Sequence, residues 1–302
     1  MDQAQQLRNI IKANQQRPLA RVITVTSGKG GVGKSNTAIN LAVQFRKMGQ
    51  KVIILDADFG LANIEIMFGA VPKHSLYDLI YKGMSMSDII TWGPGEVGFI
   101  SGGSGIVGMS DLSRDYLTYI IKNLAQLDAM ADVIIIDTGA GISDAVLEFL
   151  VASGEILLVT TPEPTSITDA YSLLKALSRH PRFSNEHSQI KVISNRVGSE
   201  QEGKTLFNKL NVVVSKYLNL GLEFLGSIPQ DMELSNASGS MSSACLIRGT
   251  LMVWGPTPCT ASRCSACIRS PANSYLYSSR PNSTPRPTSS MPPSIARSIA
   301  SV

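Results

Sequence analysis

The sequence predicts an α/β fold in which a mostly parallel, twisted sheet has helices on both faces. Two observations predict this fold. Short apolar runs alternate with longer amphipathic segments along residues 20–235, which is typical of strands joined by helical crossovers. The runs, such as 133–136 and 156–159, are apolar throughout and do not alternate with polar residues. Each strand is therefore expected to be buried on both faces.

Each element of this fold follows from one of the two patterns. Strands are expected at the short apolar runs, which are residues 21–26, 51–56, 97–101, 132–137, 155–160, 190–195 and 223–228. Helices are expected at the amphipathic segments between them, which are residues 34–48, 116–129, 143–152, 166–177 and 203–217. Each helix separates two strands, as right-handed crossovers require. A further amphipathic helix is expected at 2–13, outside the sheet.

Composition divides the chain into three parts. Residues 236–302 contain no Asp, Glu or Lys, but they hold six Arg, sixteen Ser, eight of the fifteen Pro and all four Cys. We therefore predict an N-terminal helical arm at 1–19, one α/β domain at 20–235 and a Ser/Pro/Arg-rich tail at 236–302. The abrupt change of composition favours a shift of reading frame in the tail, and the alternative is a genuine disordered extension.

The positive charge of the chain belongs to this tail. The net charge is +4, but residues 1–235 carry 21 Lys and Arg against 23 acidic residues. The positive net charge of the whole chain is therefore no evidence for a nucleic-acid-binding domain. No run of 18 apolar residues occurs, and the first 17 residues are polar and amphipathic where a signal peptide would be apolar, so we expect neither a signal peptide nor a membrane span, but a cytoplasmic protein. The cysteines match no paired metal motif and are expected to be free thiols.

A glycine-rich loop stands between the first expected strand and the first expected helix. Its spacing is G-x-x-x-x-G-K-S, from Gly28 to Ser35. Glycines let the main chain curl so that its N–H groups face phosphate oxygens, and the helix adds its positive N-terminal end. Lys34 supplies a cation for the β and γ phosphates, and the Ser35 hydroxyl suits Mg²⁺. The nucleotide-binding residues expected here are Gly28, Lys29, Gly30, Gly31, Val32, Gly33, Lys34, Ser35 and Asn36.

The loop also contains a second lysine, Lys29. With it, residues 29–35 read K-G-G-V-G-K-S and resemble the deviant Walker A motif of the MinD/ParA group of P-loop ATPases. The resemblance covers about residues 1–235. It implies that the chain is an ATP hydrolase of weak intrinsic activity, with ATP and Mg²⁺ as ligands. It also implies an ATP-dependent homodimer in which Lys29 acts on the phosphates bound by the other subunit.

Acidic residues follow two of the expected strands at the positions where this family has them. Asp56 and Asp58 stand in L-D-A-D-F-G, which is similar to the switch I segment, and Asp137 ends a strand as in Walker B. The resemblance implies that Asp58 orients the attacking water, and that Asp56 and Asp137 support the magnesium ion with Ser35. A lone Asp at a strand end is commonly a helix cap. Several such residues at one edge of a parallel sheet favour a ligand site instead.

Two later segments resemble the family's base-binding positions. Asn195 and Arg196 follow another expected strand, and Pro229 follows the last one. An asparagine amide offers both a donor and an acceptor to adenine, and Pro229 would flank the base. The alternative for Asn195 is an ordinary turn residue.

The N-terminal segment indicates which branch of the family is closest. Residues 2–8 read D-Q-A-Q-Q-L-R and resemble the activator motif of the flagellar-number regulators, the FlhG (FleN, YlxH) branch. The resemblance implies that this segment binds and stimulates an FlhF-type GTPase, and that flagellar regulator or switch proteins are further partners. The residues expected to contact the GTPase are Asp2, Gln3, Ala4, Leu7 and Arg8.

We therefore interpret the chain as a nucleotide-switched ATPase that regulates flagellar number and placement. It acts in the cytoplasm or at the inner face of the cell membrane or the cell pole. A ParA-like partition protein or a septum-positioning MinD is the alternative, as is a scaffold that binds nucleotide without hydrolysis. The acidic domain speaks against direct DNA binding. No segment after residue 236 combines an apolar face with a lysine-rich face, so membrane attachment is not expected here although relatives have it.

Overall fold

The computed structural model describes residues 19–59, 63–103, 112–186 and 188–230. They form a sheet with the strand order β3-β4-β2-β5-β1-β6-β7-β8, which is parallel except for β3. The strands are β1 Arg21–Ser27, β2 Val52–Ala57, β3 Thr91–Trp92, β4 Gly98–Ile100, β5 Val133–Ala140, β6 Glu155–Thr160, β7 Gln189–Val197 and β8 Leu222–Pro229. The fold class predicted from the sequence is confirmed, and all seven expected strands are present.

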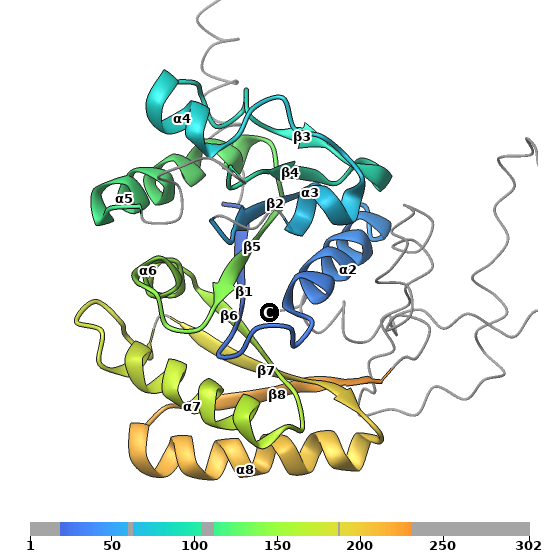
Figure 1. Ribbon diagram of the computed structural model, residues 1–302, viewed down its shortest axis with the longest axis vertical. Helices are drawn as coiled ribbons and strands as arrows, with labels where there is room; N and C mark the ends of the chain where they lie inside the picture. Colours follow the sequence, from blue (N-terminus) through green and yellow to red (C-terminus); the bar gives the residue numbers. More distant parts are fainter. Residues whose placement is uncertain (1–18, 60–62, 104–111, 187, 231–302) are drawn as a thin grey trace, which may run out of the picture.

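Helices lie on both faces of the sheet (Figure 1). They are α2 Lys34–Lys47, α3 Asn63–Phe68, α4 Leu76–Lys82, α5 Arg114–Asn123, α6 Asp144–Val151, α7 Pro164–Ser178 and α8 Glu200–Leu218, with short 3-10 turns at Pro94–Glu96 and Leu124–Ala129. One apolar cluster joins α2 and α3 to one face of the sheet, and two clusters join α4 to α8 to the other. The central strands β2 and β5 are buried on both faces, which explains why they do not alternate.

Four elements between residues 58 and 97 were not predicted, which are α3, α4, β3 and the 3-10 turn at Pro94–Glu96. The helices α3 and α4 have six and seven residues, and β3 has two, which is too short for a periodic apolar pattern. One local signal for α4 was available, because Ser75 and Asp78 form a capping box and Gly83 ends the helix in the left-handed conformation. The expected helix at 116–129 is also divided, into α5 and the 3-10 turn that follows it.

Parts of the sequence analysis fall outside the described residues. The arm at 1–19 is described only at its last residue, and the tail at 236–302, with its four cysteines, is not described at all. The division of the chain into arm, domain and tail stays a prediction. Within the described residues, no helix combines the length and the apolar character that crossing a bilayer requires.

A charged group ties three strands together at the amino ends of the sheet. Glu155 on β6 accepts hydrogen bonds from the guanidinium of Arg21 on β1, one of them at 2.7 Å, and from Lys191 Nζ on β7 at 3.2 Å. Lys191 is only 1% exposed. Burial by itself would raise the pKa of Glu155, but Arg21 and Lys191 together hold it below its ordinary value. The carboxylate therefore stabilises the fold.

Replacing Glu155 with glutamine should lower the free energy of unfolding at pH 7 by about 3 kcal/mol, because the buried Lys191 loses its partner. A carboxyl whose pKa is lower in the folded state stabilises the fold above its ordinary pKa and loses this effect as the pH falls through the folded value. The difference between variant and wild type should therefore shrink below about pH 4. Urea unfolding at pH 7 and pH 3 measures it. Glu96→Gln, which removes the exposed partner of Arg46, is the control, and an equal loss in both variants would contradict this account.

Candidate phosphate-binding site

The glycine-rich loop lies where β1 ends and α2 begins, at the carboxyl edge of the parallel sheet. Gly31 and Gly33 have φ values of +74° and +92°, which L side chains rarely adopt. Gly28 lies so close to α7 that a Cβ atom there would be 2.2 Å from the carbonyl carbon of Asp169. Glycine is therefore required at these positions by backbone conformation or by packing.

Three side chains donate hydrogen bonds to main-chain carbonyls of this loop. Ser27 Oγ donates to the carbonyl of Lys29 at 2.9 Å, and Thr37 Oγ1 donates to the carbonyl of Gly33 at 2.9 Å. Asn195 Nδ2, from the end of β7, donates to the carbonyl of Val32 at 2.6 Å. These bonds use loop carbonyls only. The N–H groups of the loop and the amino end of α2, whose first turn holds no acidic residue, stay available for an anion.

Lys34 and Asp137 form the buried centre of the site. Lys34 Nζ lies 3.2 Å from Asp137 Oδ1, and the exposed fractions of the two side chains are 8% and 0%. The nearby Ser35 hydroxyl helps to lower the pKa of the same carboxylate. The other oxygen, Asp137 Oδ2, is buried without a hydrogen-bond partner in the described part of the chain. A buried carboxylate oxygen in this position fits a cation or a water bound to one.

Asp56 adds a second carboxylate to this centre. Burial, reinforced by the negative charge of Asp137, raises the pKa of Asp56 to about 7. Burial also raises the pKa of Asp137 and of Asp58, although Lys34 opposes the shift at both. A divalent cation would compensate these charges more fully than one lysine does. The residues present therefore fit Mg²⁺.

No group of three or more His, Cys, Asp or Glu side chains within the described ranges is arranged to hold a metal ion by itself. Mg²⁺ does not require such a group, because it commonly binds through one or two carboxylates together with substrate phosphates and water. Ser35 and Asp137 are the side chains that would hold it here, with Asp56 nearby.

Asp58 lies between two segments that follow different strands. Asn63 Nδ2 donates to Asp58 Oδ2 at 3.0 Å. A Cβ atom on Gly139, at the end of β5, would be 3.3 Å from Asp58 Oδ1. The segment after β2, which the sequence analysis compared with switch I, and the end of β5, which follows Asp137, therefore meet at this carboxylate.

Lys29 has a different environment from Lys34. Its Nζ donates to the carboxylate of Glu163 and, at 2.8 Å, to Thr165 Oγ1. Glu163 is the N-cap residue of α7, and the side chains of Lys29 and Glu163 are 34% and 54% exposed. Sequence reasoning missed both partners of Lys29. The available signal was their position directly after β6, at the same edge of the sheet.

The expected base-binding residues lie beside the loop or close to it. Asn195 is 8% exposed and contacts the loop as described above. Arg196 is exposed and has φ +57°, and Pro229, at the end of β8, pairs with Val197. The structure thus brings the loop, the three aspartates and Asn195 to one edge of the sheet. The expected GTPase-binding residues, Asp2, Gln3, Ala4, Leu7 and Arg8, lie outside the described residues.

A comparison with protein-family models agrees with this geometry. The model named ParA, described as NUBPL iron-transfer P-loop NTPase, matches residues 18–250. The chain belongs to the ParA/MinD family of P-loop NTPases.

Similar ParA/MinD proteins were found by sequence and by structure. The Antiactivator FleN of Pseudomonas aeruginosa is 41% identical over 217 residues, which are 72% of this chain and 76% of FleN. The Flagellum site-determining protein YlxH of Helicobacter pylori is 35% identical over 69% of each chain. The solved structure of the septum site-determining protein MinD with Mg-ADP, from Pyrococcus horikoshii, has a TM-score of 0.59 at 24% identity, with 74% of this chain and 86% of that chain covered. The structural likeness shows the fold.

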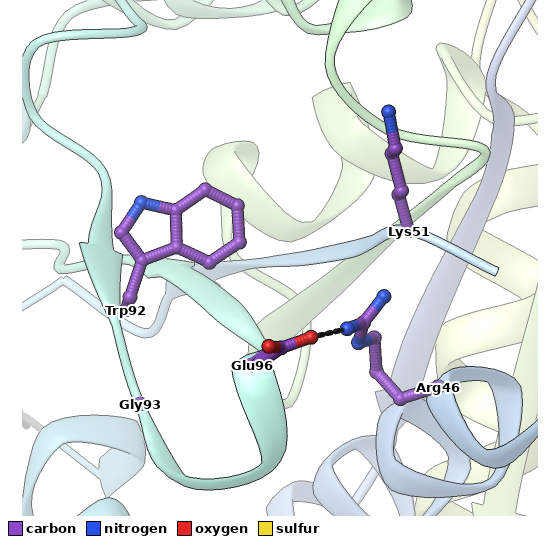
Figure 2. A pocket seen from close by; sticks show the side chains of 5 residues that line it. All are labelled: Arg46, Lys51, Trp92, Gly93 and Glu96. Carbon is purple, nitrogen blue, oxygen red and sulfur yellow. Dashed lines mark hydrogen bonds and ion pairs between the residues drawn. The ribbon is translucent and has the colours of Figure 1, made fainter. Parts of the chain in front are cut away.

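A surface cavity of about 470 Å³ lies elsewhere on this ParA/MinD fold (Figure 2). It is lined by Arg46, Lys51, Trp92, Gly93 and Glu96, and Arg46 is paired with Glu96. Arg46 is in the last turn of α2 and Lys51 directly precedes β2, so the cavity is at the amino ends of the strands. In parallel α/β sheets ligands bind at the carboxyl ends, and the cavity is therefore distinct from the phosphate-binding loop.

Proposed function

We propose that this ParA/MinD protein is an ATPase whose dimerisation is switched by Mg-ATP. The observation that carries the proposal is the different placement of the two lysines of one phosphate loop. Lys34 is buried against Asp137, whereas Lys29 is partly exposed and is held by Glu163. Lys29 does not contact the buried centre of its own site. Phosphates bound by a second subunit would give it a ligand.

Each residue of the site has its own role in ATP hydrolysis. Loop N–H groups and the amino end of α2 bind the phosphates, and Lys34 neutralises charge between the β and γ phosphates. Ser35 and Asp137 would hold Mg²⁺, and the ion would compensate the charge that develops on the phosphates. Asp58 accepts a hydrogen bond from the attacking water and orients it toward the γ phosphate. The carboxylate of Asp56 accepts hydrogen bonds from the backbone N–H groups of Asp58 and Ile64. It thereby positions the segment that carries Asp58.

Lys29 completes the site of the partner subunit. To do so it leaves Glu163 and Thr165 and approaches the phosphates bound by the other copy, where its charge stabilises the transferred phosphoryl group. Hydrolysis releases the γ phosphate, so Lys29 loses the negative charge that it contacts in the partner subunit and the dimer dissociates. Hydrolysis then acts as a timer for the dimer.

We also propose that this switch regulates flagellar number and placement. The similarity to FleN and YlxH supports this role, since their names describe an antiactivator and a flagellum site-determining protein. The proposed partners are an FlhF-type GTPase, bound through Asp2, Gln3, Ala4, Leu7 and Arg8, and a flagellar transcription activator that the ATP form restrains. The proposed location is the cytoplasm, with recruitment to the cell pole. FleN is 41% identical to this chain over 217 aligned residues, whereas the putative septum site-determining protein MinD of Oltmannsiellopsis viridis is 30% identical over 217 residues, which favours the flagellar role over septum positioning.

Size-exclusion chromatography and calorimetry with Mg-ATP and Mg-ADP test the switch. The wild type should bind both nucleotides and elute as a dimer with Mg-ATP only. Lys34→Gln, which keeps a hydrogen-bond donor near Asp137 but removes the cation, should weaken Mg-ATP binding by about 100-fold, because a buried charge-assisted contact is lost. Binding of Mg-ATP by the variant at wild-type strength, or a wild type that releases no heat with Mg-ATP, would overturn the proposal.

A further inference from the structure

A side chain from a strand distant in the sequence holds the phosphate loop at Val32. Asn195 lies at the end of β7, which is separated from β1 by β6 in the sheet. Its Nδ2 donates to the Val32 carbonyl at 2.6 Å, and a Cβ atom on Gly33 would lie 2.4 Å from the same nitrogen. The amide therefore occupies the space that any side chain at Gly33 would need. Both Asn195 and Val32 are less than 9% exposed.

The chemistry of the two neighbours determines the orientation of this amide. Val32 presents a carbonyl, which only accepts, and Arg196 presents a backbone N–H, which donates to Asn195 Oδ1 at 2.9 Å. Exchanging the nitrogen and oxygen of the amide would place two acceptors together and two donors together. One N–H and one lone pair remain for a nucleotide base. Holding the loop is therefore compatible with a contact between the same side chain and a base.

We propose that Asn195 is a positioning residue for the phosphate loop, in addition to its proposed contact with the base. It holds Val32 and Gly33 so that the next residue, Lys34, and the amino end of α2 face the phosphates. This inference rests on the proposed function, because it takes a magnesium-bound triphosphate as the ligand of the loop. The positioning role predicts that Asn195 also affects the binding of phosphate ligands that have no nucleotide base. A residue that only reads adenine does not affect them, whereas a residue that shapes the loop does.

The variant Asn195→Asp tests this consequence, because it keeps the acceptor for Arg196 but presents an acceptor to the Val32 carbonyl. Calorimetry should show that Mg-ATP and magnesium-bound inorganic tripolyphosphate both bind about tenfold more weakly to the variant than to the wild type, since a buried hydrogen bond is lost and repulsion replaces it. Asn195→Ala, which adds no charge, should weaken both ligands in the same direction. Weaker binding of ATP with unchanged binding of tripolyphosphate would show that Asn195 serves the base alone, and would overturn the proposal.

Hydrogen exchange in protein without nucleotide gives a second, independent readout. The amides of residues 28–36 should exchange faster in Asn195→Asp, while those of the central strand β5 keep wild-type rates. Asn208→Asp is the matched control, because Asn208 is exposed on α8, and it should change neither binding nor exchange. Unchanged exchange of the loop in Asn195→Asp overturns the positioning role even if the wild type binds no nucleotide. A wild type that binds neither ligand, with faster loop exchange in the variant, overturns the proposed function and leaves the positioning role standing.

Discussion

Replacing Asp58 with asparagine should lower kcat for ATP hydrolysis by about 100-fold or more, because general-base or water-orienting carboxylates contribute rate factors of this size. Binding of Mg-ATP should not weaken. Burial and the charge of Asp137 already disfavour the ionised form of Asp58, whose pKa is raised, so removing its charge relieves repulsion at the site. The variant should therefore accumulate as an ATP-bound dimer, since the step that ends the dimer is the one that is slowed.

Phosphate release and size-exclusion chromatography in the presence of Mg-ATP measure the two effects together. Asparagine is the suitable replacement because it preserves the size of the side chain and an oxygen that accepts from Asn63, which donates to Asp58 at 3.0 Å. Asp115→Asn, at an exposed position on α5, is the control and should behave as the wild type. A variant that loses the dimer together with hydrolysis would contradict the assigned role, since Asp58 would then be needed for assembly.

Replacing Lys29 with alanine should abolish the ATP-dependent dimer while the monomer still binds Mg-ATP. Lys29 contacts Glu163 and Thr165 rather than the buried centre formed by Lys34 and Asp137, so its loss removes no contact at that centre. Each protomer of the dimer would lose one cation facing the partner's phosphates, and charge-assisted contacts of this kind are the strong ones. Sedimentation velocity with Mg-ATP should show monomer at protein concentrations where the wild type is fully dimeric.

Glu163→Gln is the opposite change at the same contact and should favour the dimer. The carboxylate of Glu163, whose pKa is lowered by Lys29, holds Lys29 on its own subunit and competes with the partner's phosphates. The ion pair is exposed, so its removal should shift the dimerisation midpoint by only about two- to fivefold toward lower protein concentration. Lys204→Ala, which breaks an exposed pair with Glu200 on α8, is the matched control. A midpoint shifted toward higher concentration in Glu163→Gln would show that the carboxylate supports the dimer instead of competing with it.

Prediction from sequence succeeded where the signal is local. The seven parallel strands and the phosphate loop follow from apolar runs and from fixed spacing within a few residues. It failed for α3, α4 and β3, because elements this short are stabilised by packing against the sheet rather than by a pattern of their own. The expected positions of Asp56, Asp58 and Asp137 at one edge follow from the parallel order of the strands, and the structure places them there.

The partners of the site residues depended on the tertiary structure. Lys29 and Glu163 are separated by 134 positions, and Val32 and Asn195 by 163. Spacing within the sequence says nothing about contacts over such separations, because they depend on which strands become neighbours. Asn195 illustrates the difference. The resemblance to the family implied a contact with a base, whereas the place of Asn195 on β7, beside β6, put the same amide against the phosphate loop.

The sequence by itself determined that this chain builds a phosphate loop with two lysines at the start of a helix, since backbone curvature and a helix end are local properties of adjacent residues. The order β5-β1-β6 in the folded sheet decided that one lysine is held by Glu163, which follows β6, while the other is buried against Asp137 on β5. Burial and the neighbouring charges determine how strongly a charged side chain interacts and whether it can bind a further partner. Both arise only when distant strands pack together.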